Sequence, residues 1–127
     1  MKEYQFIKTE RLDNGIIVLT LDRPPLNLIS PPVLYELKSI FTELNEDDTL
    51  RAVVLTGSQR AVCAGADSNT FGDVPRYTNI PLGQLCYNVV EDCRLPVIAA
   101  IEGYCLGGGL ELALCEVWYS ELKNHGL

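Results

Sequence analysis

The organisation of this chain follows from one segment, Pro96-Val-Ile-Ala-Ala-Ile-Glu-Gly-Tyr-Cys-Leu-Gly-Gly-Gly-Leu-Glu-Leu-Ala-Leu-Cys115. Its first part, Val97–Ile101, is a continuous apolar run opened by a proline, which predicts a strand covered on both faces. The three glycines at 107–109 let the backbone turn sharply and approach a ligand with no Cβ in the way. Strong helix formers follow at 110–114, so the unpaired N–H groups of a new helix are expected at the turn, where they stabilise developing negative charge. We therefore expect the chemistry at this turn, with Glu111 beside it.

The composition predicts one soluble globular domain that includes all of residues 1–127. The chain is 47% hydrophobic with a mean hydropathy of +0.10, and a chain of this length buries roughly two thirds of its unfolded surface. Its net charge of −7, with no cluster of lysines or arginines, argues against a nucleic-acid or anionic-membrane surface. The first residues form no apolar signal region, and no run approaches the roughly 18 apolar residues of a membrane span. These features predict a cytoplasmic protein.

The cysteines and the single histidine favour neither a disulfide framework nor a metal site. The five cysteines are widely spaced, contain no Cys-x-x-Cys pair and lie mostly within apolar segments. The histidine, His125, has no ligand spacing around it, so we expect no metal site. Cys105 precedes the three glycines but has no neighbouring histidine to activate it, and we interpret it as a buried structural thiol rather than a nucleophile.

The first third of the chain predicts a hairpin followed by a helix. Strand-like runs at 4–10 and 15–21 flank Asp13-Asn14-Gly15, and Asn-Gly between such runs is a good hairpin signal. Two adjacent prolines end the second strand. A helix follows with Ser30 as its N-cap and two more prolines in its first turn. The apolar residues of this helix recur on one face, namely Val33, Leu34, Leu37, Ile40, Phe41 and Leu44.

The remaining segments alternate between strands and helices. Residues 52–56 predict a buried strand, and residues 60–67 combine small side chains with Asp67 as a possible cap for a short helical turn. Residues 68–80 have the length of a lid or binding loop, or of a plain surface excursion. A second helix is expected from about residue 79 or 81, and residues 116–122 predict a short strand. The apolar stripe of the expected second helix consists of Leu82, Leu85, Cys86, Val89, Val90 and Cys93.

This alternating order predicts an α/β fold with parallel strands joined by right-handed crossovers. Four blocks then resemble the enoyl-CoA hydratase/isomerase (crotonase) family, and specifically the N-terminal half of its fold. They are Val18-Leu-Thr-Leu-Asp-Arg-Pro-Pro-Leu-Asn27, Arg51-Ala-Val-Val-Leu-Thr-Gly57, Cys63-Ala-Gly-Ala-Asp67, and Pro96-Val-Ile-Ala-Ala-Ile-Glu-Gly103 leading into Gly107-Gly-Gly-Leu-Glu-Leu-Ala113. The resemblance implies a truncated crotonase-like (ClpP/crotonase) spiral of βαβ turns. It also implies an acyl-CoA substrate, with no cofactor besides that coenzyme A thioester.

The same resemblance implies an oxyanion hole and a catalytic glutamate. In similar proteins two backbone N–H groups bind the thioester oxygen, and these map here onto Ala66 and Gly108. Fixed dipoles of this kind stabilise a thioester enolate without rearranging during the reaction. Glu111 matches the first of two glutamates that position a water and move its proton, which implies hydration of 2-enoyl-CoA to 3-hydroxyacyl-CoA in fatty acid metabolism. The residues expected to contact the substrate are Ala64, Gly65, Ala66, Asp67, Gly107 and Gly108.

The sequence also departs from the family. The second glutamate, which follows a Gly-x-Pro-Glu block in relatives, has no counterpart in the 127 residues, and Asn69 stands where many relatives carry a lysine. Three functions therefore stay open: a hydratase, which is a lyase; an isomerase; and a non-catalytic truncated paralogue or fragment that binds CoA esters or subunits. A simpler role for Glu111 is to favour a helix N-terminus by about 0.3–1 kcal/mol. Relatives associate as trimers or hexamers, so we expect a homo-oligomer.

Overall fold

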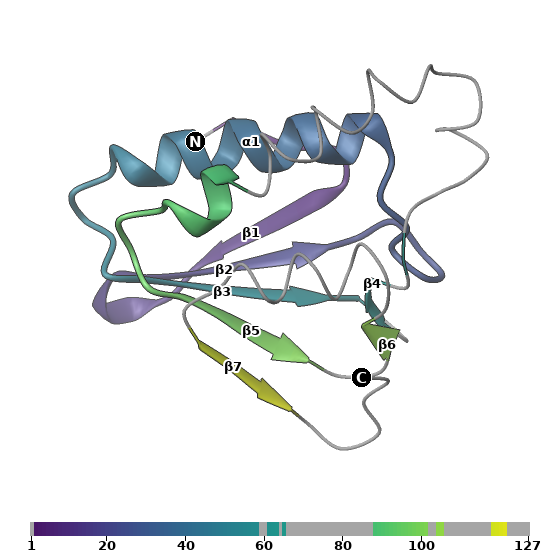
Figure 1. Ribbon diagram of the computed structural model, residues 1–127. Helices are drawn as coiled ribbons and strands as arrows, with labels where there is room; N and C mark the ends of the chain where they lie inside the picture. Colours follow the sequence, from purple (N-terminus) through teal and green to yellow (C-terminus); the bar gives the residue numbers. More distant parts are fainter. Residues whose placement is uncertain are drawn as a thin grey trace.

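The computed structural model describes residues 2–58, 61–63, 65, 88–101, 104–105 and 118–121, and for residues 61, 62, 104, 105 and 118–121 it describes the backbone. Within these ranges, one helix, α1 (Pro31–Asn45), lies across one face of a five-stranded sheet (Figure 1). The sheet has the order β1-β2-β3-β5-β7, formed by Ile7–Arg11, Ile16–Leu21, Ala52–Gly57, Val97–Ile101 and Trp118–Glu121. A separate pair of short strands, β4 (Ala61–Cys63) and β6 (Tyr104–Cys105), lies beyond the carboxyl ends of β3 and β5 (Figure 1).

The strand directions confirm the predicted α/β arrangement. Strands β1 and β2 pair antiparallel, as expected for a hairpin. Strands β2, β3, β5 and β7 are mutually parallel, with Val54 opposite both Val18 and Ile98. The short strand expected within residues 116–122 is therefore present as the edge strand β7, and all carboxyl ends of the parallel strands face the same edge of the sheet.

The hairpin turn depends on two residues with positive φ. Asn14 has φ 70° and Gly15 has φ 80°, within the single turn at Asp13–Gly15. The Gly15 carbonyl accepts a 2.7 Å hydrogen bond from the N–H of Arg51, which ties the hairpin to the start of β3. A Cβ built on Gly15 would lie 2.8 Å from the carbonyl oxygen of Thr49. Glycine is thus required here both for its φ and for the close approach of a second backbone segment.

Helix α1 is found where the sequence predicts it, and its six expected core residues are all buried. Ser30 occupies the N-cap position with extended backbone angles, but its side chain makes no capping hydrogen bond. Within the described residues its Oγ is buried without any hydrogen-bond partner. A cap oxygen normally accepts from the N–H of the second or third helical residue, and the second is Pro32, which has no N–H. The cap position was therefore predicted correctly, and the cap bond was not.

The core lies between α1 and one face of the sheet. Along β2 and β5, fully buried residues alternate with half-buried ones, because successive side chains of a strand point to opposite faces. Val97, Ala99 and Ile101 contact the core, whereas Ile98 and Ala100 on the other face are half-buried. The expected cover of both faces of β5 is thus complete on the helix side and partial on the other.

Two predictions for the middle of the chain have different outcomes. Residues 88–91 are helical, with Val90 buried and Val89 and Cys93 packed against the core, which fits the end of the predicted second helix. Its expected start and the loop at 68–80 lie outside the described residues. Strand β4 was not predicted, since we expected only a helical turn from residues 60–67. Three residues are too few to show a strand period, so only the pairing with β6 identifies it.

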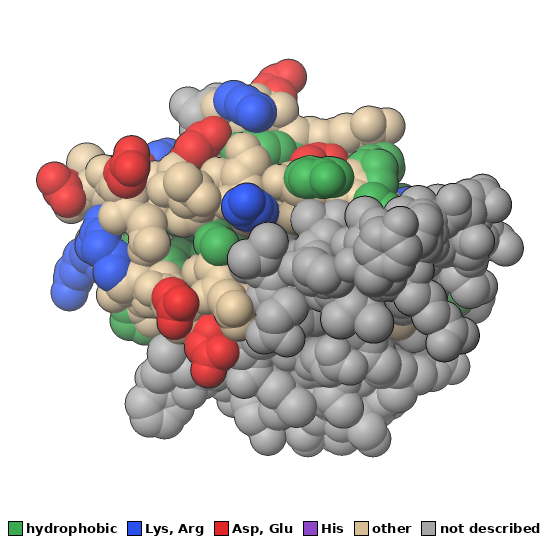
Figure 2. All heavy atoms as spheres, turned by 45° about the horizontal axis from the view of Figure 1, so that its top comes forward, with side chains coloured by type: hydrophobic (Ala, Val, Ile, Leu, Met, Phe, Trp, Pro, Cys, Tyr) green, Lys and Arg blue, Asp and Glu red, His purple; other side chains and the backbone are tan. Residues whose placement is uncertain are grey.

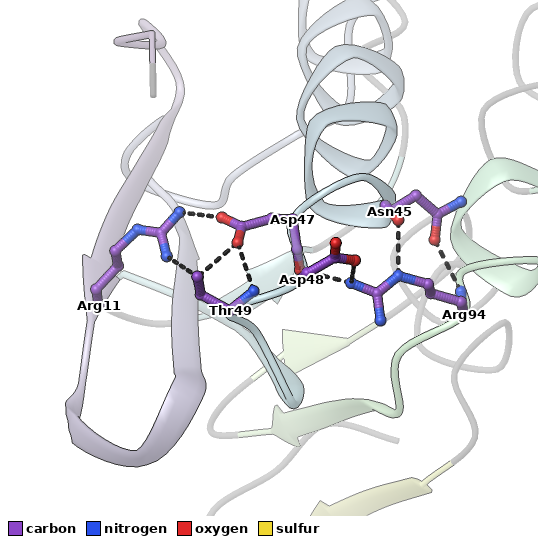
Figure 3. Close-up of polar contacts among 6 residues, drawn as sticks. All are labelled: Arg11, Asn45, Asp47, Asp48, Thr49 and Arg94. Carbon is purple, nitrogen blue, oxygen red and sulfur yellow. Dashed lines mark hydrogen bonds and ion pairs between the residues drawn. The ribbon is translucent and has the colours of Figure 1, made fainter.

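A polar cluster fixes the turn that connects α1 to β3 (Figure 3). The Asp47 carboxylate accepts hydrogen bonds from the backbone N–H and the hydroxyl of Thr49, and it forms a 2.5 Å ion pair with Arg11 of β1. These hydrogen bonds, the Thr49 hydroxyl first, lower the pKa of Asp47 well below its usual value. On the other side, Arg94 donates to the Asn45 carbonyl at 2.7 Å, and its N–H donates to the Asn45 side chain at 2.8 Å. The turn therefore joins β1, α1 and the segment that enters β5.

Figure 2 shows acidic and basic side chains interspersed over the described part of the face that carries α1. The described residues include no helix that is both long enough and apolar enough to cross a membrane.

Candidate functional site

The two predicted parts of the site follow two strands that lie side by side. Strand β4 pairs with β6 in parallel, with Ala61 opposite Tyr104 and Cys63 opposite Cys105. The segment 64–67 follows β4 directly, and the segment 107–111 begins two residues after β6. Because the two strands are parallel, β4 and β6 end, at Cys63 and Cys105, on the same edge of this small sheet. Strand pairing thus brings together two parts of the chain that are about forty residues apart.

Only one of the predicted site residues lies within the described part of the chain. Gly65 is described, whereas the other six lie outside the described residues, namely Ala64, Ala66, Asp67, Gly107, Gly108 and Glu111. Their roles as oxyanion donors, substrate contacts and catalytic carboxylate therefore stay predictions.

Gly65 has a conformation and a set of contacts that few other residues could provide. It is buried and has φ 135°, a value that side chains of L-residues rarely allow. Its carbonyl oxygen accepts a hydrogen bond of 2.8 Å from the N–H of Ile29. The same oxygen accepts a second one of 3.4 Å from the Cys63 thiol. The carbonyl is therefore held from two directions at the point where the chain enters the predicted substrate segment.

The thiol of Cys63 is part of the core. Cys63 is fully buried, and burial raises the pKa of its thiol. The thiol is consequently protonated at neutral pH and acts as a hydrogen-bond donor. The interpretation of Cys105 as a structural thiol stays a prediction, because its side chain lies outside the described part of the structure. Cys93, the other cysteine whose side chain is described, is also free.

A buried asparagine holds the loop that supplies the Ile29 N–H. Asn27 is 2% exposed and has φ 53°. Its Oδ1 accepts a 2.8 Å hydrogen bond from the N–H of Arg23, and its Nδ2 donates to the Ser58 carbonyl at 3.0 Å. Sequence analysis placed Asn27 within a family block but gave it no structural role. The available signal was a polar residue in a Pro-Pro-x-Asn turn, where asparagine tolerates positive φ.

The described residues hold no candidate metal site, and an open groove lies at the other end of α1 from this region. The described residues contain no group of three His, Cys, Asp or Glu side chains that could hold a metal ion. An open groove of about 530 Å³ lies between the C-terminal end of α1 and residues 88–94, lined by Thr42, Asn45, Glu46, Asn88, Val89, Asp92 and Arg94. It is at the opposite end of α1 from β4 and β6 (Figure 1) and therefore separate from the candidate site.

Comparison with known proteins identifies the family and the fold of this chain. The sequence matches the enoyl-CoA hydratase/isomerase family over residues 11–119, a range that includes every predicted site residue. It is 38% identical over 117 residues to a probable enoyl-CoA hydratase of Mycobacterium tuberculosis, covering 90% of this chain and 45% of that protein. It is 37% identical over 108 residues to a peroxisomal fatty acid beta-oxidation multifunctional protein of Arabidopsis thaliana, covering 80% of this chain and 15% of that protein.

Solved structures give the same result. The chain superposes with a TM-score of 0.91 on an enoyl-CoA hydratase/carnithine racemase from Magnetospirillum magneticum, at 30% identity, covering 97% of this chain and 48% of that one. For an enoyl-CoA hydratase from Bacillus anthracis, the TM-score is 0.84 at 33% identity, covering 92% of this chain and 47% of that one. The chain therefore belongs to the enoyl-CoA hydratase/isomerase family and has the crotonase-like α/β fold that its sequence predicted. It spans about half the length of these solved relatives.

Proposed function

We propose that this protein binds acyl-CoA thioesters and hydrates 2-enoyl-CoA to 3-hydroxyacyl-CoA. One observation supports the proposal: the strands that precede the two predicted site segments, β4 and β6, pair in parallel and end at the same edge of one small sheet. Family membership supports the acyl-CoA substrate class. The names of relatives that act in fatty acid beta-oxidation support a role in fatty acid metabolism.

In the proposed mechanism the backbone N–H groups of Ala66 and Gly108 bind the thioester carbonyl oxygen. Addition of a water oxygen at C3 of the substrate moves electrons from the C2–C3 double bond onto the thioester carbonyl oxygen and forms an enolate. The two N–H groups stabilise this charge because they are already oriented toward it. Glu111 accepts a proton from the attacking water and then delivers a proton to C2, which restores the carboxylate. A second carboxylate, which relatives supply from a Gly-x-Pro-Glu block, has no match within these 127 residues.

Two other functions of the same site are distinguished by their products. An isomerase would convert a 3-enoyl-CoA into the conjugated 2-enoyl-CoA, and the family description includes this activity. A non-catalytic CoA-ester binder would bind the thioester without converting it. The match of Glu111, within Gly107-Gly-Gly-Leu-Glu111, to the first glutamate of similar hydratases is the reason for preferring hydration.

The test is a rate measurement on the purified protein with crotonyl-CoA. Hydration removes the conjugated double bond, so its absorbance falls as the reaction proceeds. We expect turnover in the wild-type protein and its loss in Glu111→Gln, which keeps the size of the side chain but removes the carboxylate. Appearance of that absorbance from a 3-enoyl-CoA would identify an isomerase instead. A folded protein that binds crotonyl-CoA and converts neither substrate would be a non-catalytic binder.

We also propose that the protein works as a homo-oligomer and in the cytoplasm. Light scattering at micromolar concentration tests the first point, and a folded monomer would contradict it. Fractionation of the source cells tests the second, because the relatives include peroxisomal proteins as well as a mycobacterial one.

A further inference from the structure

We infer that the N–H of Ile29 and the thiol of Cys63 form a clamp on the Gly65 carbonyl that orients the oxyanion donor of the next residue. The inference rests on the proposed function, because the N–H group that the clamp would orient is the proposed oxyanion donor of Ala66. Ile29 and Cys63 are thereby assigned to positioning rather than to contact with the substrate. Its basis is the pair of hydrogen bonds at 2.8 and 3.4 Å that converge on one carbonyl oxygen.

Peptide geometry connects the clamp to the donor. The carbonyl of Gly65 and the N–H of residue 66 belong to one planar unit, in which a trans arrangement directs them oppositely. Any interaction that fixes the direction of the carbonyl also fixes the direction of that N–H. The carbonyl is held toward Ile29 and Cys63, on the buried side. The N–H that follows is thereby directed away from these core residues.

The conformation of Gly65 indicates that this direction is specified rather than incidental. A φ of 135° is accessible to glycine and strongly unfavourable for other residues. Without the clamp, a glycine has many alternative conformations, and its peptide plane could rotate. Two hydrogen bonds on one buried carbonyl restrict that rotation, which matters because an oxyanion donor is effective only in a narrow range of orientations.

Each arm of the clamp is itself held in place. Ile29 is buried, and the loop before it is fixed by Asn27, whose side chain binds Arg23 and Ser58 on either side. Cys63 is fully buried and lies in β4, paired with β6. The clamp thus joins the turn after β2 to the end of β4. Because both of these segments are held by the core, the orientation of the Gly65 carbonyl is fixed relative to the core.

The experiment uses three substitutions of Cys63 that separate the donor from the volume it fills. Cys63→Ala and Cys63→Val both remove the S–H donor, one with a smaller side chain and one with a larger side chain, whereas Cys63→Ser keeps a donor. Val90→Ala is the matched control, since Val90 is equally buried but belongs to the segment before β5. The probe is the CoA thioester of 4-dimethylaminocinnamic acid, whose absorption moves to longer wavelength when its carbonyl is polarised. This readout needs binding but no turnover.

We expect a shift to longer wavelength in the wild-type protein, Cys63→Ser and Val90→Ala, and a smaller shift in Cys63→Ala and Cys63→Val. Hydration by the last two should show kcat lowered about twofold to tenfold with KM little changed, which corresponds to one modest hydrogen bond. Equal shifts in the wild-type protein and both donor-free variants would overturn the clamp, as would a Cys63→Ser protein that behaves like Cys63→Ala. A wild-type protein that binds the probe with no shift would instead overturn the proposed function, and the clamp with it.

A second measurement tests the clamp without any substitution. In the isotope-labelled wild-type protein, the Ile29 N–H should exchange slowly with solvent and show scalar coupling to the Gly65 carbonyl carbon across their hydrogen bond. Rapid exchange with no coupling would refute the clamp even if the Cys63 variants failed to fold.

Discussion

Replacement of Gly15 by alanine tests the most tightly constrained turn of the described fold. Gly15 has φ 80°, and an L-residue in the left-handed region costs roughly 1–2 kcal/mol. The added Cβ would also lie 2.8 Å from the Thr49 carbonyl oxygen, which is backbone and cannot rotate away. Relief of this contact requires the hairpin to move from β3 and weakens the 2.7 Å hydrogen bond from Arg51, worth about 1 kcal/mol net. We therefore expect Gly15→Ala to lower the free energy of unfolding by about 2–3 kcal/mol.

Urea denaturation followed by circular dichroism measures this loss, and Asn14→Ala is the matched control. Asn14 lies beside Gly15 with a similar φ of 70° and is exposed, so its substitution carries only a left-handed cost of about 1 kcal/mol. The difference between the two variants isolates the contact with Thr49. A Gly15→Ala protein no less stable than Asn14→Ala would show that the hairpin does not approach the α1–β3 turn as described.

Two further predictions concern the turn after α1 and the helix itself. The pKa of Asp47 is lowered by folding, so its contribution to stability is present above the ordinary carboxyl pKa and is lost as the pH falls toward the folded-state value. Asp47→Asn should therefore be less stable than the wild-type protein at pH 7, with a difference that shrinks in acid; a pH-independent difference in urea denaturation would contradict this. On α1, Leu37→Ala removes a fully buried side chain and should cost about 2–5 kcal/mol, whereas Tyr35→Ala, at a position 62% exposed, should change stability by less than about 0.5 kcal/mol. Similar thermal unfolding of the two helix variants would be inconsistent with the orientation of α1.

Most of the described fold could be predicted from local sequence patterns. The six apolar positions of α1 repeat with helical period and are all buried. The Asn14-Gly15 pair and the apolar runs of β2, β3 and β5 likewise give correct strands and a correct turn. These features depend on residues close together in the sequence, where period and turn chemistry decide the structure.

The features that sequence reasoning missed depend on contacts between distant segments. Strand β4 is defined by its pairing with β6, about forty residues further along the chain. The contacts of Gly65 with Ile29 and Cys63 connect residues up to 36 positions apart. Such contacts produce no repeating pattern of residues in the sequence. For the site itself, resemblance to the family supplied the candidate residues, and the structure adds that the strands preceding them, β4 and β6, are paired in parallel.

The most direct test of the proposed site is the carbon-13 chemical shift of a CoA thioester labelled at its carbonyl carbon and bound to the protein. Two N–H donors on the carbonyl oxygen withdraw electron density from that carbon, so the signal should move downfield on binding. A saturated acyl chain keeps the measurement independent of turnover. A thioester that binds with an unchanged carbonyl shift would contradict an oxyanion hole formed by the segments after β4 and β6.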